Sequence, residues 1–196
     1  MFINDATEVL KSFQTAGPVV KCEPYGNGHI ADTFLVCCDN SGETKRYILQ
    51  RMNRNVFKNP EKLMSNIERV TAYLRERTDD ARTVMCLVPT VNNASYIVDG
   101  SGEYWRMYDF IENSLCLEKP ETKEDFYQSA IAFGRFQQTL NGFPAEELYE
   151  IIPDFHNTPK RYRDFLEAVE NDVCGRADSV QEEIAFVKAR KDFYSV

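Results

Sequence analysis

Residues 25–36, YGNGHIADTFLV, place two glycines a few residues before the apolar run Phe34-Leu35-Val36. Glycine permits a tight turn and lets backbone N–H groups approach a ligand with no Cβ in the way. From Val19 to Asp39 the pattern on both sides of these glycines is typical of β-strands. We therefore expect a strand, a glycine turn and a returning strand. A plain hairpin turn is the alternative interpretation, because a G-x-G pair alone is a weak signal.

A third strand, a helix and a hairpin follow this turn along the chain. Residues 46–52 read as a strand after a polar turn at 40–43, and a helix is expected from Pro60, whose fixed φ suits a first helical turn. Residues 95–98 and 104–108 read as two further strands, joined at Asp99-Gly100, a strong hairpin signal. The sequence thus predicts five antiparallel strands with one helix inserted after the third.

Beyond Glu112 the pattern is helical. Helices are expected over residues 123–140, from Thr158, and after Ser179, which with Glu182 makes a capping-box pattern. The first of these helices would turn an inner face toward neighbours: Phe126, Ala130, Ile131, Phe133 and Gly134. We expect an α+β chain with an N-terminal lobe at 1–107, a hinge at 108–113 and the start of an incomplete helical lobe at 114–196.

Composition excludes several classes of protein. The chain has 196 residues, 43% of them hydrophobic, and a formal net charge of -8, which is ordinary for a globular domain and unfavourable for nucleic-acid binding. No apolar run approaches the length of a membrane span, and the N-terminus lacks the pattern of a secretion signal, so a cytoplasmic location is expected. The six cysteines form no C-x-x-C pair, which favours reduced thiols over zinc or disulfides.

Three segments resemble the aminoglycoside-phosphotransferase-like family, most closely its N-acetylhexosamine 1-kinase branch. They are YGNGHIADTFLV (25–36), RYILQRMNRNVFKNPEKLMSNIERVTAYL (46–74) and YWRMYDFIENS (104–114). The resemblance runs over essentially the whole chain. It implies a kinase-like small lobe and a phosphotransferase that uses Mg²⁺ and ATP to phosphorylate a small hydroxyl compound, such as the anomeric hydroxyl of an N-acetylhexosamine.

The resemblance also implies where ATP would bind. The glycine turn would cover the phosphates, a cation on the third strand would neutralise them, and the segment after the fifth strand would contact adenine. The implied cofactor-binding residues are Gly26, Asn27, Gly28, His29, Asp32, Thr33, Arg51, Glu68, Tyr108, Asp109, Phe110 and Ile111. Arg51 is the predicted phosphate cation, and Gln50 is the competing register, since neighbours on a strand face opposite ways. Glu61 remains an alternative to Glu68 as the carboxylate that orients the cation.

The sequence departs from the family in one respect. It contains no H-x-D-x-x-x-x-N catalytic loop and no accompanying metal-binding Asp motif, both of which phosphoryl transfer in this family requires. We therefore expect the N-terminal part of a longer kinase, inactive alone, whose catalytic residues and magnesium ligands lie elsewhere, and which self-associates through the surface left by the missing half.

The sequence leaves two other functions open. One is a non-catalytic nucleotide-binding or interaction module. The other, less favoured, is a sulfatase of the mucin-desulfatase type, whose C-x-P-x-R motif would have to be Cys22-Glu23-Pro24-Tyr25-Gly26, with Gly26 in place of the arginine.

Overall fold

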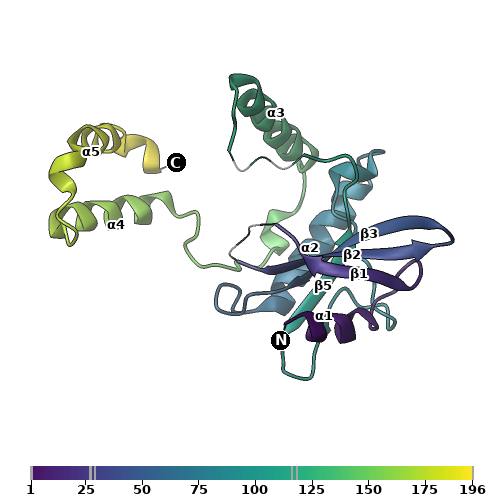
Figure 1. The fold of residues 1–196 in the computed structure, drawn as a ribbon. Coiled ribbons are helices and arrows are strands. Elements are labelled where there is room, and N and C mark those ends of the chain that lie inside the picture. The colour runs from purple at the N-terminus through teal and green to yellow at the C-terminus, as the bar shows by residue number, and fades with distance from the viewer. Residues whose placement is uncertain (1, 27, 29, 116, 118, 196) are drawn as a thin grey trace. The chain divides into compact units, whose positions relative to one another are not determined.

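The computed structural model describes residues 2–26, 28, 30–115, 117 and 119–195 (Figure 1). The chain divides into two compact units, Met1–Ile151 and Ile152–Val196. Within the described residues, no helix is both long enough and apolar enough to cross a membrane.

The described part of the first unit contains a five-stranded antiparallel sheet. Its strands are β1 (Val19–Pro24), β2 (Asp32–Asn40), β3 (Glu43–Arg51), β4 (Ile97–Val98) and β5 (Tyr104–Asp109), in the order β1-β2-β3-β5-β4. The first three strands form the predicted meander, and helix α2 (Pro60–Arg75) is inserted after the third. The predicted five-stranded α+β architecture is thus confirmed.

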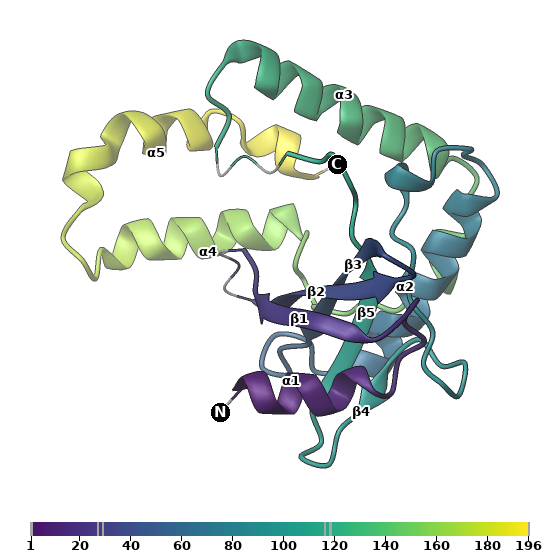
Figure 2. The same ribbon diagram turned by 45° about the vertical axis from the view of Figure 1, so that its right-hand side comes forward.

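Helix α1 (Phe2–Leu10) covers one face of this sheet, as Figure 2 shows. Side chains alternate along a strand, so every second residue of β2, β3 and β5 points toward this helix. The resulting core consists of Ala6, Val9, Leu10, Phe13, Phe34, Val36, Cys38, Tyr47, Leu49, Val88, Trp105 and Met107. We call this side of the sheet the α1 face.

Helix α2 lies on the opposite side, which we call the α2 face. The helix begins at Pro60, and the Asn59 side chain accepts a hydrogen bond from the Lys62 N–H at 3.1 Å. The Tyr104 hydroxyl donates to the Glu61 carboxylate at 3.2 Å. Because Tyr104 alternates with the core residue Trp105, this contact places the first turn of α2 across the sheet from α1.

The expected hairpin joins β4 to β5. The Asp99 N–H donates to the Glu103 carbonyl at 2.9 Å and closes the turn. The Asp99 carboxylate accepts three hydrogen bonds within the turn, two from Ser101 and one from the Glu103 N–H, and a fourth from the indole of buried Trp105 at 2.7 Å. One aspartate therefore ties the turn to the core.

Helix α3 (Lys123–Thr139) starts and ends close to its predicted bounds, but its predicted inner face is not buried. Phe126 is 68% exposed and Phe133 69% exposed. A Cβ added at Gly134 would meet no atom within 4 Å. The prediction of a buried face and a close helix neighbour at Gly134 was therefore wrong, because an amphipathic pattern predicts a helix but does not supply a layer to cover it.

The second unit consists of helices α4 (Thr158–Asn171) and α5 (Gln181–Lys188) with the short turns η3 (Ala177–Val180) and η4 (Lys191–Ser195). The α4 helix begins at the predicted Thr158, and Tyr162 contacts Tyr194 with ring centroids 5.1 Å apart. The predicted capping box at Ser179 is absent. Its hydroxyl donates instead to the Arg176 carbonyl, because the chain there forms a 3-10 turn before α5 begins.

Candidate functional site

The glycine turn leads from β1 into β2. Gly26 has φ +78°, a left-handed conformation that favours glycine. The Tyr25 N–H donates to the Thr33 carbonyl at 2.9 Å and closes the base of the turn. A Cβ added at Gly28 would meet no atom within 4 Å. Asn27 and His29, also assigned to this site from the sequence, lie outside the described residues.

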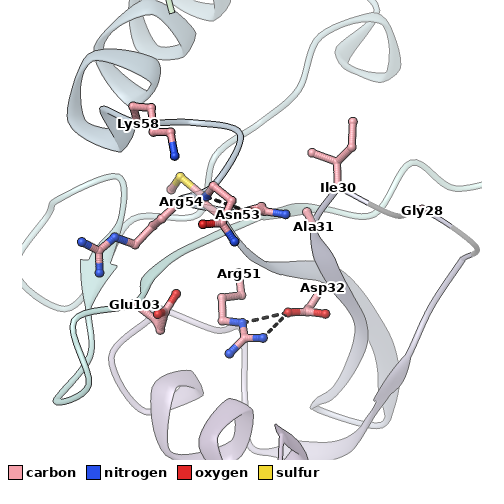
Figure 3. A pocket seen from close by; sticks show the side chains of 11 residues that line it. Gly28, Ile30, Ala31, Asp32, Arg51, Asn53, Arg54, Lys58 and Glu103 are labelled. Carbon is pink, nitrogen blue, oxygen red and sulfur yellow. Dashed lines mark hydrogen bonds and ion pairs between the residues drawn. The ribbon is translucent and has the colours of Figure 1, made fainter. Parts of the chain in front are cut away.

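The turn borders a polar hollow of about 570 Å³ at the ends of β2 and β3 (Figure 3). Its volume lies within the range of small-molecule sites. The lining residues are Gly28, Ile30, Ala31, Asp32, Arg51, Met52, Asn53, Arg54, Asn55, Lys58 and Glu103. The hollow therefore brings together the glycine turn, Asp32 and Arg51, which the sequence analysis assigned to a single site.

Arg51 is held by a carboxylate inside this hollow. Its Nε donates to Asp32 Oδ2 at 2.8 Å, and a second donor of the same guanidinium reaches the same oxygen (Figure 3). The guanidinium also lies over the Trp105 ring, 5.9 Å from its centroid. Trp105 is a core residue of the α1 face, so Arg51 belongs to that face. A phosphate would have to compete with Asp32 for it.

Gln50, the competing register, lies on the α2 face. Its Nε2 donates to Thr33 Oγ1 at 3.1 Å, and its Oε1 accepts two hydrogen bonds from Arg106, at 2.9 and 3.2 Å. Sequence reasoning missed Arg106. The signal that could have found it is the alternation in residues 104–108, where a cation stands between the two core residues Trp105 and Met107 and must face the other side.

The two α2 carboxylates lie near tyrosines of the hairpin that contains β4 and β5. Glu68 is exposed, and Glu61 accepts the hydrogen bond from Tyr104. Burial raises the pKa of Tyr96, and the negative charges of Glu61 and Glu68 raise it further. The carboxylate that is seen to pair with Arg51 is that of Asp32.

The predicted hinge residues follow the end of β5. The Asp109 N–H donates to the Cys86 carbonyl at 2.9 Å, and the Phe110 N–H donates to the Arg46 carbonyl at 3.1 Å. The protein itself therefore uses both donors. Ile111 is 40% exposed, and its carbonyl accepts a hydrogen bond from the Ser114 hydroxyl at 2.7 Å.

An aromatic pair connects this segment to the glycine turn. The Tyr25 and Phe110 rings meet edge to face, with centroids 5.8 Å apart. The Arg46 guanidinium lies 4.2 Å from the centroid of the Phe110 ring and is hydrogen-bonded to Glu112. This hydrogen bond lowers the pKa of Glu112. Tyr108 lies between this pair and Arg106 along β5, and burial raises the pKa of its hydroxyl.

The described residues contain no group of three or more His, Cys, Asp or Glu side chains placed to hold a metal ion. The described residues therefore do not by themselves supply a set of magnesium ligands.

Comparison with known proteins identifies a structural relative. No family model matches the sequence. Among solved structures, the chain is similar to an aminoglycoside phosphotransferase from Alicyclobacillus acidocaldarius subsp. acidocaldarius, with a TM-score of 0.64 and 13% sequence identity. The match covers 97% of this chain and 53% of that protein. The chain therefore has a kinase-like fold of the aminoglycoside phosphotransferase type and spans about half the length of the phosphotransferase that it matches.

Proposed function

We propose that this chain is the nucleotide-binding N-terminal part of an ATP-dependent small-molecule kinase. The observation that carries the proposal is the similarity in fold to a phosphotransferase over 97% of the chain. In kinase-like folds a glycine-rich turn between the first two strands covers the nucleotide phosphates. Here the corresponding turn has a left-handed Gly26 and an unobstructed Gly28, which supports the same use of its backbone.

The adenine base would bind near Tyr25 and Phe110. The two rings are in contact, and Phe110 lies under Arg46, which faces the α2 side because it alternates with the core residue Tyr47. They offer aromatic surface for stacking. Recognition of the adenine edge would fall to the backbone of Ile111. Tyr108 is already paired with Ile48 in the sheet, and the N–H groups of Asp109 and Phe110 already donate to protein carbonyls. The proposal therefore narrows the four predicted hinge residues to one whose backbone reads the base.

The acceptor is proposed to be a sugar hydroxyl, with an N-acetylhexosamine as the first compound to test, on the basis of the three sequence segments given above. The sequence contains no H-x-D-x-x-x-x-N pattern, so the base and the magnesium ligands are not assigned to this chain. We expect the 196-residue chain to bind ATP and to show no sugar-dependent ATP consumption. The cytoplasm is the proposed location, since the described cysteines are free thiols.

Substitution of Gly28 tests the proposed role of the turn. Gly28→Val places a branched side chain in open space, so the fold should tolerate it. If the backbone there approaches the phosphates, the new side chain should weaken ATP binding by about tenfold, roughly 1.4 kcal/mol, measured by isothermal titration calorimetry.

Gly100→Val is the matched control. Gly100 also has open space around it and lies in the β4–β5 turn. The Gly100→Val variant should bind ATP with the same affinity as the unmodified chain. Equal affinity of the two variants, or no ATP binding by the unmodified chain, would contradict the proposed function.

A further inference from the structure

A row of three polar side chains crosses the α2 face next to the glycine turn. Thr33, Gln50 and Arg106 are opposite one another in the register of β2, β3 and β5. Gln50 donates to Thr33 and accepts from Arg106, so hydrogen bonds run along the whole row. Thr33 follows Asp32 directly, and Asp32 lines the hollow beneath the turn. The row therefore lies at the end of the sheet where the turn begins.

Arg106 has no opposite charge to compensate it among the described residues. The hydrogen-bond acceptor that it contacts is the neutral amide oxygen of Gln50, at 2.9 Å from Nη2 and 3.2 Å from Nε. Burial lowers the pKa of its guanidinium, and the titratable group that acts against this shift is the Tyr108 hydroxyl rather than a carboxylate. A partly buried cation without a counter-charge is unfavourable, and an anionic ligand would relieve this cost.

The guanidinium also has an edge available to a ligand. Gln50 occupies two of its nitrogens and fixes its plane. Within the described part of the chain, Ser95 Oγ is the fully buried side-chain polar atom that lacks a hydrogen-bond partner, and no nitrogen of Arg106 is in that condition. The remaining nitrogen of Arg106 is therefore accessible to solvent. A planar fork fixed on one edge and open on the other is suited to phosphate oxygens.

We propose that Arg106 binds the phosphate groups of the nucleotide and that Gln50 is the positioning residue that holds it. The nucleotide as ligand rests on the proposed function, whereas the anion site itself rests on the geometry of the row. Arg51 lies on the opposite face, where Asp32 compensates its charge. Arg106 thus takes the role of the phosphate cation from the neighbouring strand, because the residue that the third strand contributes to this row is a glutamine.

Substitutions in the row test this proposal, with ATP and inorganic tripolyphosphate as probes in titration calorimetry. Arg106→Gln removes the charge, and we expect it to weaken both probes by at least about tenfold. Gln50→Glu keeps the acceptor in place but adds a carboxylate that neutralises Arg106. We expect this variant to bind both probes more weakly by a similar factor and to have a higher thermal unfolding midpoint. If the row had a purely structural role, a substitution that raises the midpoint would not weaken binding. Arg82→Gln is the matched control, since it removes one positive charge at an exposed ion pair with Asp80 and should leave the affinity for both probes unchanged.

The outcomes separate this proposal from the proposed function. ATP binding that is unchanged in Arg106→Gln and Gln50→Glu would overturn the role of Arg106 and leave nucleotide binding standing. A loss of ATP affinity in Arg51→Gln without a loss in Arg106→Gln would also overturn the role of Arg106. Tripolyphosphate binding that depends on Arg106, with ATP bound no more tightly, would support the anion site and refute adenosine recognition. Failure of the unmodified chain to bind either probe would overturn both. If Arg106→Gln does not fold, the affinities of Gln50→Glu and Arg106→Lys for the two probes decide whether Arg106 binds the phosphates.

Discussion

At the scale of single residues, the Asp99 carboxylate accepts four hydrogen bonds outside the candidate site. Burial alone would raise the pKa of its carboxyl, but hydrogen bonds from Ser101, Trp105 and Glu103 outweigh this effect and lower the pKa from 3.8 to about 2. A carboxyl whose pKa is lower in the folded state stabilises the fold above its unfolded pKa. That stability is lost as the pH falls from about 4 to about 2.

We expect Asp99→Asn to lower the free energy of unfolding at neutral pH by about 1 kcal/mol. The value is kept small because the carboxylate is near solvent. The asparagine amide would also point an N–H group at one of the groups that donate a hydrogen bond to Asp99. Urea unfolding followed by the fluorescence of Trp105, the single tryptophan, measures the change. The difference from the unmodified chain should shrink at about pH 2.5, where the native carboxyl is itself becoming protonated.

Asp79→Asn, in the exposed loop after α2, is the control for the general effect of removing an acidic side chain. An Asp99→Asn variant with the same stability and the same acid sensitivity as this control would contradict the role given to Asp99.

The candidate site also shows what single residues reveal in the sequence. The glycine turn and Arg51 could be assigned to one site because each lies next to a recognisable local pattern, and both line one hollow. Arg106 could be assigned to the face opposite Trp105 by alternation. The contact between Arg106 and Gln50 could not be predicted, because the pairing of β3 with β5 skips over a helix and a strand along the chain. Strand order is set by tertiary packing, which local patterns do not report.

At the scale of secondary-structure elements, Gly17 limits how the chain enters β1. A Cβ added at Gly17 would lie 1.8 Å from the Asp39 carbonyl oxygen of β2, and the Asp39 N–H donates to the Pro18 carbonyl at 3.0 Å. The backbone of both segments is therefore in direct contact. We expect Gly17→Ala to lower the free energy of unfolding by about 2 to 3 kcal/mol, since backbone atoms must move to admit the methyl group. Thermal or urea unfolding measures it.

Gly134→Ala is the matched substitution with the opposite expectation. Gly134 lies in α3 with open space around it, so alanine should stabilise the helix by about 0.5 to 1 kcal/mol. If the two variants changed stability in the same direction, the close approach at Gly17 would not be the cause.

The elements differ in how far their sequences determine them. The start of α4 and the β4–β5 hairpin follow from proline and Asp-Gly signals that act within a few residues. For α3 the same kind of reasoning gave the helix but not its surroundings, and Phe126 and Phe133 are exposed. Local signals determine an element, whereas burial depends on what other segments bring to it.

At the scale of the whole molecule, the first compact unit extends beyond the sheet. The sheet ends at Asp109, but the unit continues to Ile151. Side chains of α2 account for part of this extension: Asn66 exchanges two hydrogen bonds with the Tyr149 backbone, and Tyr73 donates to the Asn141 carbonyl at 2.8 Å. These are contacts between exposed polar groups far apart in sequence, which hydrophobic periodicity cannot reveal.

This extension predicts which part of the chain folds alone. Residues 1–151 contain the entire core around Trp105 together with the partners of α2 at 141–149. We expect this fragment to unfold cooperatively, measured by Trp105 fluorescence in urea.

A fragment of residues 1–113 keeps the sheet but loses the hydrogen bonds of Asn66, Arg69 and Tyr73. Because several such bonds are lost together, it should be less stable by about 1 to 3 kcal/mol. Equal stability of the two fragments would mean that residues 114–151 add nothing to the fold of the lobe. A fragment of 1–151 without a cooperative transition would show that its core does not suffice.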